Sequence, residues 1–509
     1  MSEPEIHELP FPAFLVFGTG ACLMMVELVV ARILAEHLGG SLYSWTSVVG
    51  VALTGIALGG VLGGRMADRM NPRHLLWFLF LTSSLLCPTV LLGELLVGAK
   101  GVLSDLQRPV RVLIGAPILL LPAAISLSCI PPVVARAVLE GKRDWGHRVG
   151  RLYAWGSLGS IAGTLLAGFF FISFIGTRSL LCLLGALLAG ACLLLGAHRQ
   201  YNVILGLWCA VLLALTAILY QGIAWENDYF TRESNYYRIH ISFDQEENIK
   251  TLYLDNLAHS ILHPGQPENL AYEYEQIFAL LTDRATNETH ASTLTLGAGG
   301  YAFPRYLVEH YPQWQVHVVE IDPLLTRVAH EQLELPYDTP IVTFHSDARR
   351  FLAEMNPKRR YNLIYGDAFN SFSIPWHLTT REFHEILISH LKEGGTYLAN
   401  VIDIYRSSRF LGAYVNTLRS TFPHVTVFAT QPVRDQTGRD TFVVAASLAP
   451  IQLAGIREEA IDRDVDLYIL TEEQVQESIR RAGRVLFTDS FAPVDQSMAS
   501  MLWTDRGKD

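Results

Sequence analysis

The sequence predicts a bundle of about seven transmembrane α-helices followed by an α/β domain, which carries a small β-hairpin module and a doubly wound sheet. Three observations predict this class. Half of the 509 residues are hydrophobic and only 17% are charged. Apolar runs fill the first 220 residues, and strand-like and helix-like segments alternate after about residue 230. The chain is also longer than one hydrophobic core usually supports, so more than one domain is expected.

Composition places the domain boundaries. We assign residues 1–224 to a multi-pass transmembrane domain, 225–288 to the β-hairpin module with a connecting helix, and 289–509 to the doubly wound domain. Up to residue 225 the chain has 14 Lys+Arg and 10 Asp+Glu, and the remainder has 25 and 39. An acidic domain repels nucleic acid and suits a small cationic substrate, so no nucleic-acid partner is expected.

The first part contains seven runs that are each about long enough to cross a bilayer. They lie near residues 12–35, 44–64, 75–98, 112–135, 152–175, 179–197 and 201–220. Small residues recur at helical spacing, as in Gly55, Gly59 and Gly63, which predicts close helix packing in lipid. Glu27 and Arg32 form either a functional intramembrane pair or a structural one at a helix end. All six cysteines lie in this part without metal-ligand spacing, so no metal site is expected.

The charges of the loops bear on orientation. The loops at 65–74, 136–151 and 198–200 hold nine Lys/Arg, and the alternate loops hold five. The positive-inside rule places the richer set in the cytoplasm, and seven crossings then place the acidic part outside. The acidic part, however, contains the glycine turn and acid of residues 293–320, a pattern typical of nucleoside sites. If its ligand is a nucleoside compound made in the cytosol, the acidic part must face the cytoplasm, which is the opposite orientation. We expect a multi-pass cell-membrane protein with a cytoplasmic catalytic domain, against the charge bias.

The polar part begins with a predicted hairpin, made of strands Tyr237–Phe243 and Lys250–Leu254 around a polar turn. Residues 268–284 are helix-like. Strands and helices then alternate, which predicts a parallel, doubly wound sheet. The later strands are Val342–Phe344, Leu363–Tyr365, Thr396–Val401 and Val425–Ala429, and the helical stretches are 348–355, 379–391 and 407–421.

Residues 293–320 hold the clearest chemical signal. A short strand runs into a glycine turn, a helix-like segment follows, and a second strand ends on Glu320. Glycines let the backbone approach a ligand, and an acid about twenty residues further on can bind two ribose hydroxyls. The pattern predicts a nucleoside site in a Rossmann-like sheet. The alternative is an ordinary turn in which the acid only caps a strand. The glycines of the turn are Gly297, Gly299 and Gly300.

Eight motifs, in this order, resemble those of the spermidine synthase family. They are Ser-Asn-Tyr-Tyr-Arg-Ile (234–239), Leu-Tyr-Leu-Asp-Asn (252–256), Tyr-Glu-Tyr-Glu (272–275), Gly-Ala-Gly-Gly (297–300), Val-Glu-Ile-Asp (319–322), Asp-Ala-Arg-Arg-Phe-Leu (347–352), Gly-Asp-Ala-Phe-Asn (366–370) and Leu-Thr-Thr-Arg-Glu-Phe (378–383). The resemblance covers roughly residues 230–450. With Phe-Ala-Pro-Val-Asp at 491–495, the whole chain resembles the branch in which a membrane domain precedes the synthase domain, whose Rossmann-like sheet is of the methyltransferase type.

The resemblance implies a reaction and its residues. Spermidine synthases transfer an aminopropyl group from decarboxylated S-adenosylmethionine to an amine, usually putrescine, and release methylthioadenosine. By resemblance Glu320 holds the ribose hydroxyls, Asp347 receives the adenine amino group and Asp367 is the catalytic carboxylate. No prosthetic group is implied. The further nucleoside-site residues are Ile321 and Ala348, and the substrate-site residues are Tyr236, Tyr237, Tyr274 and Asn370.

Physical chemistry is consistent with these roles and leaves alternatives open. An alkylammonium has a pKa near 10.4, so the attacking nitrogen must first lose a proton, which a carboxylate at the carboxyl edge of the sheet can accept. The leaving group is neutral, so no acid or metal is required. Asp347 could instead be a helix N-cap, and Asp367 a polar residue in a turn. The tyrosines could pack the hairpin against the sheet.

The sequence also departs from the family. Gly300 stands where soluble members usually carry an aspartate, Asn370 replaces a second aspartate of the catalytic loop, and an acid is missing near Leu270. Three charged groups that would hold the ammonium groups are therefore absent. Residues that could substitute are Glu233, Asp255, Glu273, Glu275 and Asp403.

Three functional hypotheses follow. The first is a membrane-bound aminopropyltransferase that acts on a small cationic amine, with Asp367 as the base. The second keeps the nucleoside site but uses S-adenosylmethionine, as a methyltransferase. The third is a polyamine transporter or sensor whose synthase-like domain binds without catalysis. The expected partners are the amine and the lipid bilayer, and a homodimer is expected from the resemblance alone.

Overall fold

The structure is a computed structural model of the whole chain, which divides into two compact units close to residue 224. Each unit is described by itself. The predicted boundary at residue 288 stays a prediction. The residues that the structure describes are 11–98, 101–140, 143–196, 199–220, 228–368, 374–407, 409–433 and 438–499.

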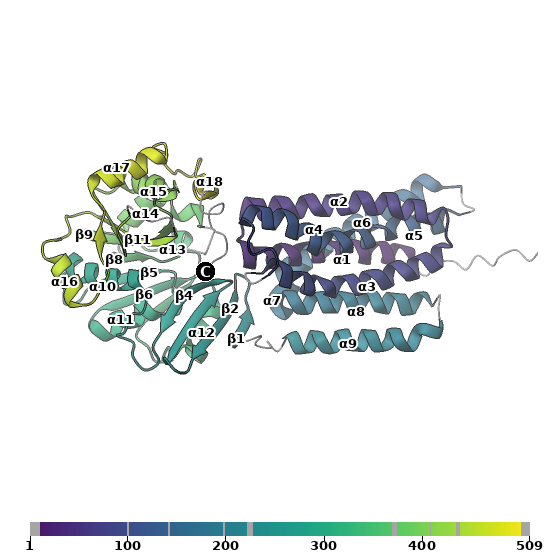
Figure 1. Cartoon of the computed structure of the whole chain (residues 1–509), viewed down its shortest axis with the longest axis horizontal. Coiled ribbons are helices and arrows are strands. Elements are labelled where there is room, and N and C mark those ends of the chain that lie inside the picture. Colours follow the sequence, from purple (N-terminus) through teal and green to yellow (C-terminus); the bar gives the residue numbers. More distant parts are fainter. Residues whose placement is uncertain are drawn as a thin grey trace, which may run out of the picture. The chain divides into compact units, whose positions relative to one another are not determined.

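Long apolar helices make up the first unit (Figure 1). Seven segments of its described part are long and apolar enough to cross a membrane, in agreement with the sequence. The fourth span, Arg108–Leu139, is interrupted where Pro131 and Pro132 begin a new helix, because proline cannot donate a backbone hydrogen bond. The helices are α1 (Pro12–Leu38), α2 (Leu42–Ala67), α3 (Pro72–Val97), α4 (Arg108–Ser128), α5 (Ile130–Leu139), α6 (Trp145–Leu166), the π-helix η1 (Ala167–Phe171), α7 (Ile172–Ile175), α8 (Thr177–Leu195), the short η2 (Arg199–Tyr201) and α9 (Asn202–Tyr220).

Glycines set the closest helix contacts in this unit. A Cβ added to Gly55 of α2 would lie 2.5 Å from the Cβ of Ala124 on α4, and one added to Gly59 would lie 2.6 Å from the carbonyl oxygen of Ile125. Gly163 of α6 meets the backbone of α1 in the same way. Small residues therefore let these helices approach within backbone contact, as the sequence predicts.

A cluster of charged side chains joins α1, α3 and α8. Arg178 donates to both carboxylate oxygens of Glu36 at 3.1 Å and also bonds Glu94. The Nε2 atom of His37 lies 3.0 Å from the same Glu94 carboxylate. The sequence analysis singled out Glu27 and missed this cluster, because the residues that bond each other are 57 to 142 residues apart along the chain. The cluster links three helices through charges that are unfavourable to bury singly.

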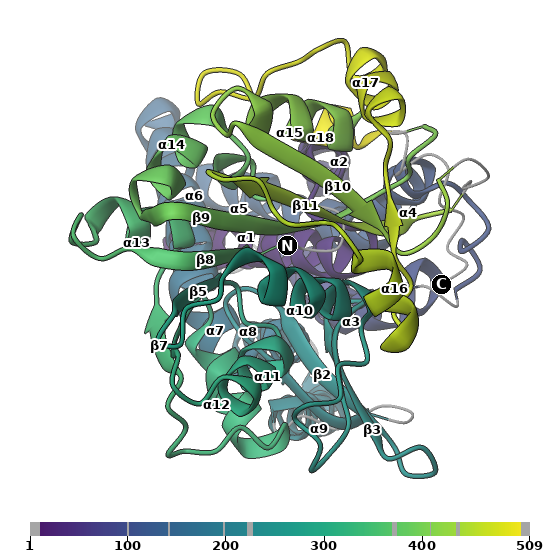
Figure 2. The same ribbon diagram turned by 90° about the vertical axis from the view of Figure 1, so that its left-hand side faces the viewer.

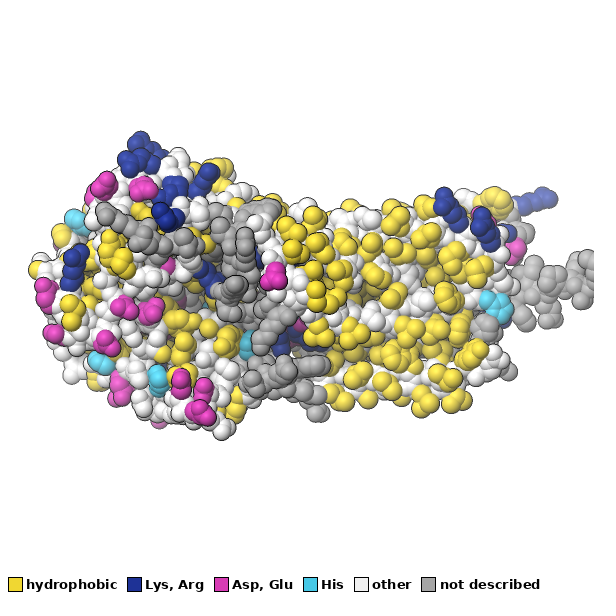
Figure 3. All heavy atoms as spheres, in the orientation of Figure 1, with side chains coloured by type: hydrophobic (Ala, Val, Ile, Leu, Met, Phe, Trp, Pro, Cys, Tyr) yellow, Lys and Arg dark blue, Asp and Glu magenta, His cyan; other side chains and the backbone are white. Residues whose placement is uncertain are grey.

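The surface of the first unit is apolar. Figure 3 shows hydrophobic side chains gathered over its helices, whereas acidic side chains are scattered over the α/β unit. Leu53, Ile161 and Phe169, for example, are 61%, 57% and 71% exposed. Contiguous apolar surface of this kind is unfavourable in water and suits contact with lipid. Together with the seven spans it indicates a membrane protein.

The second unit begins with a four-stranded antiparallel sheet, whose order is β1-β2-β3-β4. The predicted hairpin forms its centre, but the module has two strands more than the sequence analysis gave. Strand β4 was missed because Asp255–Asn256 turns the chain in two residues, with Asp255 at φ 57°, and Asp-Asn is a weaker hairpin signal than Asn-Gly. The strands are β1 (Asp228–Glu233), β2 (Arg238–Asp244), β3 (Ile249–Leu254) and β4 (Leu257–Leu262).

An eight-stranded sheet follows, in the order β12-β10-β11-β9-β8-β5-β6-β7. Strands β5 to β9 are parallel, as predicted, but β11 pairs antiparallel with both β9 and β10. The prediction of a wholly parallel sheet is therefore wrong for these strands. Residues 430–439 connect β10 to β11, and this connection is too short for the crossover that a parallel pair needs. The strands are β5 (Ser292–Leu296), β6 (Gln315–Glu320), β7 (Val342–His345), β8 (Tyr361–Gly366), β9 (Leu391–Asp403), β10 (His424–Ala429), β11 (Asp440–Ser447) and β12 (Tyr468–Ile469).

Helices cover both faces of this sheet (Figure 2). One core holds residues of α13, α14, α15 and α17, and the other holds residues of α10, α11, α12 and the small sheet. The parallel strands end at one edge, and their order reverses between β5 and β8, which is where α/β sheets hold ligands. The helices are α10 (Glu273–Ala285), α11 (Ala302–His310), α12 (Pro323–Gln332), α13 (Ala348–Glu354), the short η3 (Trp376–Leu378), α14 (Arg381–Ser389), α15 (Phe410–Arg419), α16 (Ile456–Asp462), α17 (Glu472–Arg481) and α18 (Val494–Ser497).

Candidate active site

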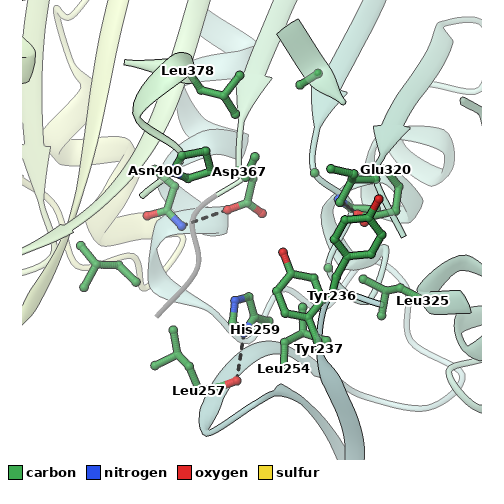
Figure 4. A pocket seen from close by; sticks show the side chains of 18 of the residues that line it. Tyr236, Tyr237, Leu254, Leu257, His259, Glu320, Leu325, Asp367, Leu378 and Asn400 are labelled. Carbon is green, nitrogen blue, oxygen red and sulfur yellow. Dashed lines mark hydrogen bonds between the residues drawn. The ribbon is translucent and has the colours of Figure 1, made fainter. Parts of the chain in front are cut away.

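A cavity of about 300 Å³ lies at the carboxyl edge of the large sheet. The ends of strands β5 to β9, the start of β11 and the turn between β3 and β4 all contribute to its wall. Figure 4 shows Asp367 and Asn400 pointing toward each other on one side, with Tyr236, Tyr237 and Glu320 on the other. The cavity is therefore where strand order predicts a ligand site.

The glycine turn after β5 forms one part of the wall. Gly297 and Gly299 have φ of 89° and 48°, a left-handed backbone that favours glycine. A Cβ added to Gly297 would lie 2.5 Å from the carbonyl oxygen of Asp367. Gly300 is placed differently: its own added Cβ would lie 2.7 Å from the Oγ of Ser260 on β4, and it is not among the wall residues. Gly300 therefore packs the turn against the small sheet.

Glu320 ends β6 and ties the glycine turn to that strand. One carboxylate oxygen accepts from the backbone N–H of Ala298 and the other from that of Asp322, both at 2.9 Å. Burial raises the pKa of Glu320 to about 7, and the two backbone donors oppose this rise. Ile321 also lines the cavity. The acid lies where the sequence predicts and already organises the turn.

Asp347 follows β7 and has two partners. One oxygen accepts from the backbone N–H of Arg350 at 2.9 Å, so the residue is the N-cap of α13. The other lies 2.8 Å from the Nε2 of His377, and this hydrogen bond holds the pKa of Asp347 below its usual value. Asp347 and Ala348 both line the cavity. The cap is confirmed, and a role toward a nucleoside stays a prediction.

Asp367 follows β8 and is held between two neutral donors. The hydroxyl of Tyr274, on α10, donates to one carboxylate oxygen, and the amide of Asn400, on β9, donates to the other, both at 3.0 Å. Burial raises the pKa of Asp367 to about 6, and both donors oppose the rise because they favour the charged form. The carboxylate is thus oriented, buried and ionised near neutral pH.

Of the four predicted substrate residues, the three tyrosines line the cavity and the asparagine is not described by the structure. Tyr236, Tyr237 and Tyr274 line the cavity, and Tyr236 is 44% exposed. The Oγ of Ser234 accepts from the backbone N–H groups of Tyr236 and Tyr237, which fixes the segment before β2. Asn370 lies outside the described residues.

The structure adds wall residues that the sequence analysis missed. Asn400 interrupts a hydrophobic strand, and a polar residue in such a run is the signal that could have indicated it. The others come from segments whose neighbours only the fold defines. They include His259, Tyr272, His377, Arg439, Asp440 and Thr441.

None of the acids suggested as substitutes for the missing family carboxylates is among the wall residues of this cavity in the described part of the chain. Asp255 accepts from the backbone N–H of Arg238, and Asp403 accepts from those of Ile404 and Leu411. These two acids therefore have structural roles. Glu275 is buried behind the wall, where it interacts electrostatically with Asp367, and Glu233 and Glu273 are not among the wall residues.

The fold and cavity define an α/β protein with a ligand site at the switch point of its sheet, and comparisons with known proteins show what part of the chain is similar to. No protein-family model matches the chain. It is 29% identical over 229 residues to the probable polyamine aminopropyl transferase of Bifidobacterium longum, an alignment that covers 42% of this chain and 49% of that protein. It is 33% identical over 132 residues to the polyamine aminopropyltransferase of Vibrio vulnificus, covering 25% and 42%.

The chain thus spans about half the length of the curated relatives it matches. Among solved structures, a probable spermidine synthase from Corynebacterium glutamicum is 24% identical, with a TM-score of 0.46, over 52% of this chain and 97% of that one. The sequence relationships show that part of the chain is similar to polyamine aminopropyltransferases, the proteins whose motifs it resembles.

Proposed function

We propose that this protein is a membrane-bound aminopropyltransferase, which moves an aminopropyl group from decarboxylated S-adenosylmethionine to putrescine or a related amine. The observation that carries the proposal is the Asp367 carboxylate, buried and oriented by Tyr274 and Asn400 on the cavity that the glycine turn also lines. The names of the related proteins support the same reaction class.

In the proposed reaction the adenosine lies against Gly297 and Gly299, with its ribose on Glu320 and its base near Asp347. The acceptor enters as an ammonium, whose pKa is near 10.4 in water, and gives a proton to Asp367. The freed lone pair attacks the methylene carbon beside the sulfonium. A C–N bond forms, the C–S bond breaks, and sulfur keeps the electron pair as neutral methylthioadenosine. Asp367 later releases the proton to solvent.

The methyltransferase alternative also has an observation in its favour. Gly300, which stands where the resemblance implies an aspartate, is packed against Ser260, so this position supplies no carboxylate for the aminopropyl ammonium of the donor. A donor that keeps its carboxylate, S-adenosylmethionine itself, is then the second candidate. Transport or sensing by a non-catalytic domain is the third.

One assay separates these functions. The full chain, purified in detergent, is incubated with putrescine or spermidine and with each sulfonium donor, and products are identified by mass. Methylthioadenosine with a lengthened amine is the expected result. Adenosylhomocysteine would favour the methyltransferase, and amine binding without turnover would favour transport or sensing.

Asp367→Asn tests the base directly. The amide keeps the size of the side chain but cannot accept the proton, so turnover should fall by roughly 10²- to 10⁴-fold. Binding of methylthioadenosine, measured by calorimetry, should stay within a few-fold of the unsubstituted protein. Unchanged turnover would remove Asp367 from this role.

We further propose that the N-terminal helices are embedded in the bilayer with the α/β unit in the cytoplasm, where the donor is made. The seven spans support the embedding. A homodimer is proposed from the family resemblance.

A further inference from the structure

The segment around Phe-Ala-Pro-Val-Asp (491–495) is a motif of the sequence that the proposed reaction does not use. Its backbone is fixed to the start of α14. The carbonyl of Phe487 accepts from the N–H of Arg381 at 2.9 Å, and the N–H of Asp489 donates to Glu382 at 3.0 Å. The ring of Phe487 is buried in the core that α14 also enters. The segment is therefore a fixed part of the second unit.

Asp489 forms an ion pair with Arg349 of α13. The Nη1 of Arg349 donates to one oxygen of Asp489 at 2.7 Å, and the Nη2 donates to the other. The hydroxyl of Thr380, the N-cap of α14, donates to the same carboxylate at 2.8 Å. A bidentate pair between a guanidinium and a carboxylate fixes the plane of the guanidinium. Asp489 therefore determines where Arg349 directs its remaining hydrogen-bond donors.

Arg349 in turn holds a residue of the cavity wall. Its Nη1 also donates to the backbone carbonyl of His377 at 3.1 Å, and the Nε2 of His377 lies 2.8 Å from a carboxylate oxygen of Asp347. Asp347 and Arg349 both belong to the start of α13, so this part of the chain contacts His377 at its ring and at its carbonyl. His377 lies in η3, which has three residues. A turn this short does little to fix its own position, so these contacts hold the ring beside Asp347.

We propose that Asp489 is a positioning residue of the nucleoside site, which acts through Arg349 to keep His377 on Asp347; this inference rests on the proposed function, in which Asp347 receives the adenine amino group. Asp489 is not among the wall residues in the part of the chain that the structure describes, whereas His377 and Asp347 are. An ionised carboxylate has about four acceptor sites. The N–H of Arg350 and the ring of His377 occupy two of them and orient the others toward the cavity.

Calorimetry of methylthioadenosine with the full chain in detergent tests this role. In Asp489→Asn the charge that orients Arg349 is lost, so the dissociation constant should rise roughly 3- to 10-fold, the equivalent of about one hydrogen bond. Glu472→Gln is the matched control, because Glu472 forms a bidentate pair with Arg419, at 2.8 Å for both bonds, and neither residue is on the wall. The control should leave the affinity unchanged. An unchanged affinity in Asp489→Asn, or an equal loss in the control, would overturn the proposal.

A double-mutant cycle distinguishes positioning from a general loss of structure. His377→Ala removes the ring through which Asp489 acts. In that background Asp489→Asn should change the affinity less than about twofold, because residues that act through one contact are not additive. If Asp489→Asn weakens binding by the same factor with and without His377, Asp489 has a structural role only and the proposal is wrong.

Nucleoside binding keeps this test separate from turnover. Adenosylhomocysteine carries the same adenosine and is titrated alongside methylthioadenosine. If no amine is lengthened but Asp489→Asn still weakens nucleoside binding, the proposed reaction fails and the positioning role stands. If turnover occurs and the variant binds as tightly as the unsubstituted protein, the positioning role alone fails. If neither nucleoside binds the unsubstituted protein, both are wrong.

Discussion

At the scale of single residues, the chemistry of this site comes from burial and from neutral hydrogen-bond donors. Asp367 is buried, which raises its pKa to about 6, and it is held by one hydroxyl and one amide rather than by a cation. A cationic partner would lower the basicity that proton transfer needs. Neutral donors orient the carboxylate and leave it both ionised at pH 7 and able to accept a proton.

This arrangement predicts the pH dependence of the reaction. In the proposed reaction Asp367 must be deprotonated to accept a proton, so kcat/KM should rise with pH through about 6 and level off above it, because burial raises the pKa of Asp367 to about 6. Tyr274→Phe removes a donor that favours the carboxylate, so the rise should move up by about one to two pH units. A pH profile of kcat/KM for both proteins measures this. An unshifted profile in the variant would separate Tyr274 from the titrating group.

At the scale of elements, the turn between β5 and α11 fits closely against the segment that follows β8. The N–H of Gly297 donates to the carbonyl of Val319 at 2.8 Å, and that of Asp367 donates to the carbonyl of Leu296 at 2.9 Å. The position of Asp367 therefore depends on the backbone of the turn. A side chain at Gly297 would press on the carbonyl of Asp367 itself.

Gly297→Ala should accordingly impair function more than stability alone explains. The added methyl would lie 2.5 Å from backbone, a clash of about 1–3 kcal/mol, so methylthioadenosine affinity and turnover should each fall roughly tenfold or more. Gly455→Ala is the matched control, since Gly455 has φ 73° and nothing within 4 Å of its added Cβ. It should lower the melting temperature slightly and leave affinity unchanged. If the two variants changed affinity and turnover equally, the effect of Gly297→Ala would come from backbone strain alone and not from the contact with Asp367.

The same elements show how far the sequence could predict the site. The glycine turn and Glu320 follow from local spacing, because a strand and its following turn are continuous in the chain, whereas Asp367 was indicated by the family resemblance of its motif. The partners of Asp367 do not follow from spacing, since Tyr274 and Asn400 lie 93 and 33 residues away from it. Gly300 shares the glycine motif yet packs on β4, a strand that the sequence analysis did not identify. The spacing of residue types along the chain therefore predicts the individual helices and strands. Which strands lie next to each other, and hence which side chains meet in the site, is known only from the fold.

The charged cluster of α1, α3 and α8 also acts at the scale of elements. Removing one partner of a buried ion pair leaves uncompensated charge and costs about 3–5 kcal/mol. Arg178→Met should therefore lower the melting temperature in detergent markedly, because Glu36 and Glu94 both lose their guanidinium. Arg148→Met is the control, since its pair with Asp144, the N-cap of α6, is exposed and contributes little to stability. Similar melting temperatures for the two variants would show that the cluster does not link the helices.

At the scale of the whole molecule, the number of crossings and the charges of the loops constrain topology together. If all seven segments cross a membrane, the loop at 65–74 and the α/β unit must lie on opposite sides of it. The basic residues of that loop favour a cytoplasmic position for the loop. A nucleoside donor made in the cytosol instead favours a cytoplasmic position for the α/β unit. If the loop charges determine the orientation, the α/β unit lies outside and its donor must come from outside the cell. If the α/β unit lies in the cytoplasm, the cytosol supplies the donor.

Cysteine labelling in intact cells distinguishes these topologies. Asp68→Cys and Asp462→Cys place thiols at exposed positions in the loop and in the α/β unit, and the native cysteines, which are buried or half-buried in the apolar unit, provide the background. With a cytoplasmic α/β unit, a membrane-impermeant maleimide should label Asp68→Cys in intact cells and Asp462→Cys only after permeabilisation. The reverse pattern would place the α/β unit outside and require an external donor. Labelling of both in intact cells would contradict seven crossings, because an odd number of spans cannot leave the two positions on one side.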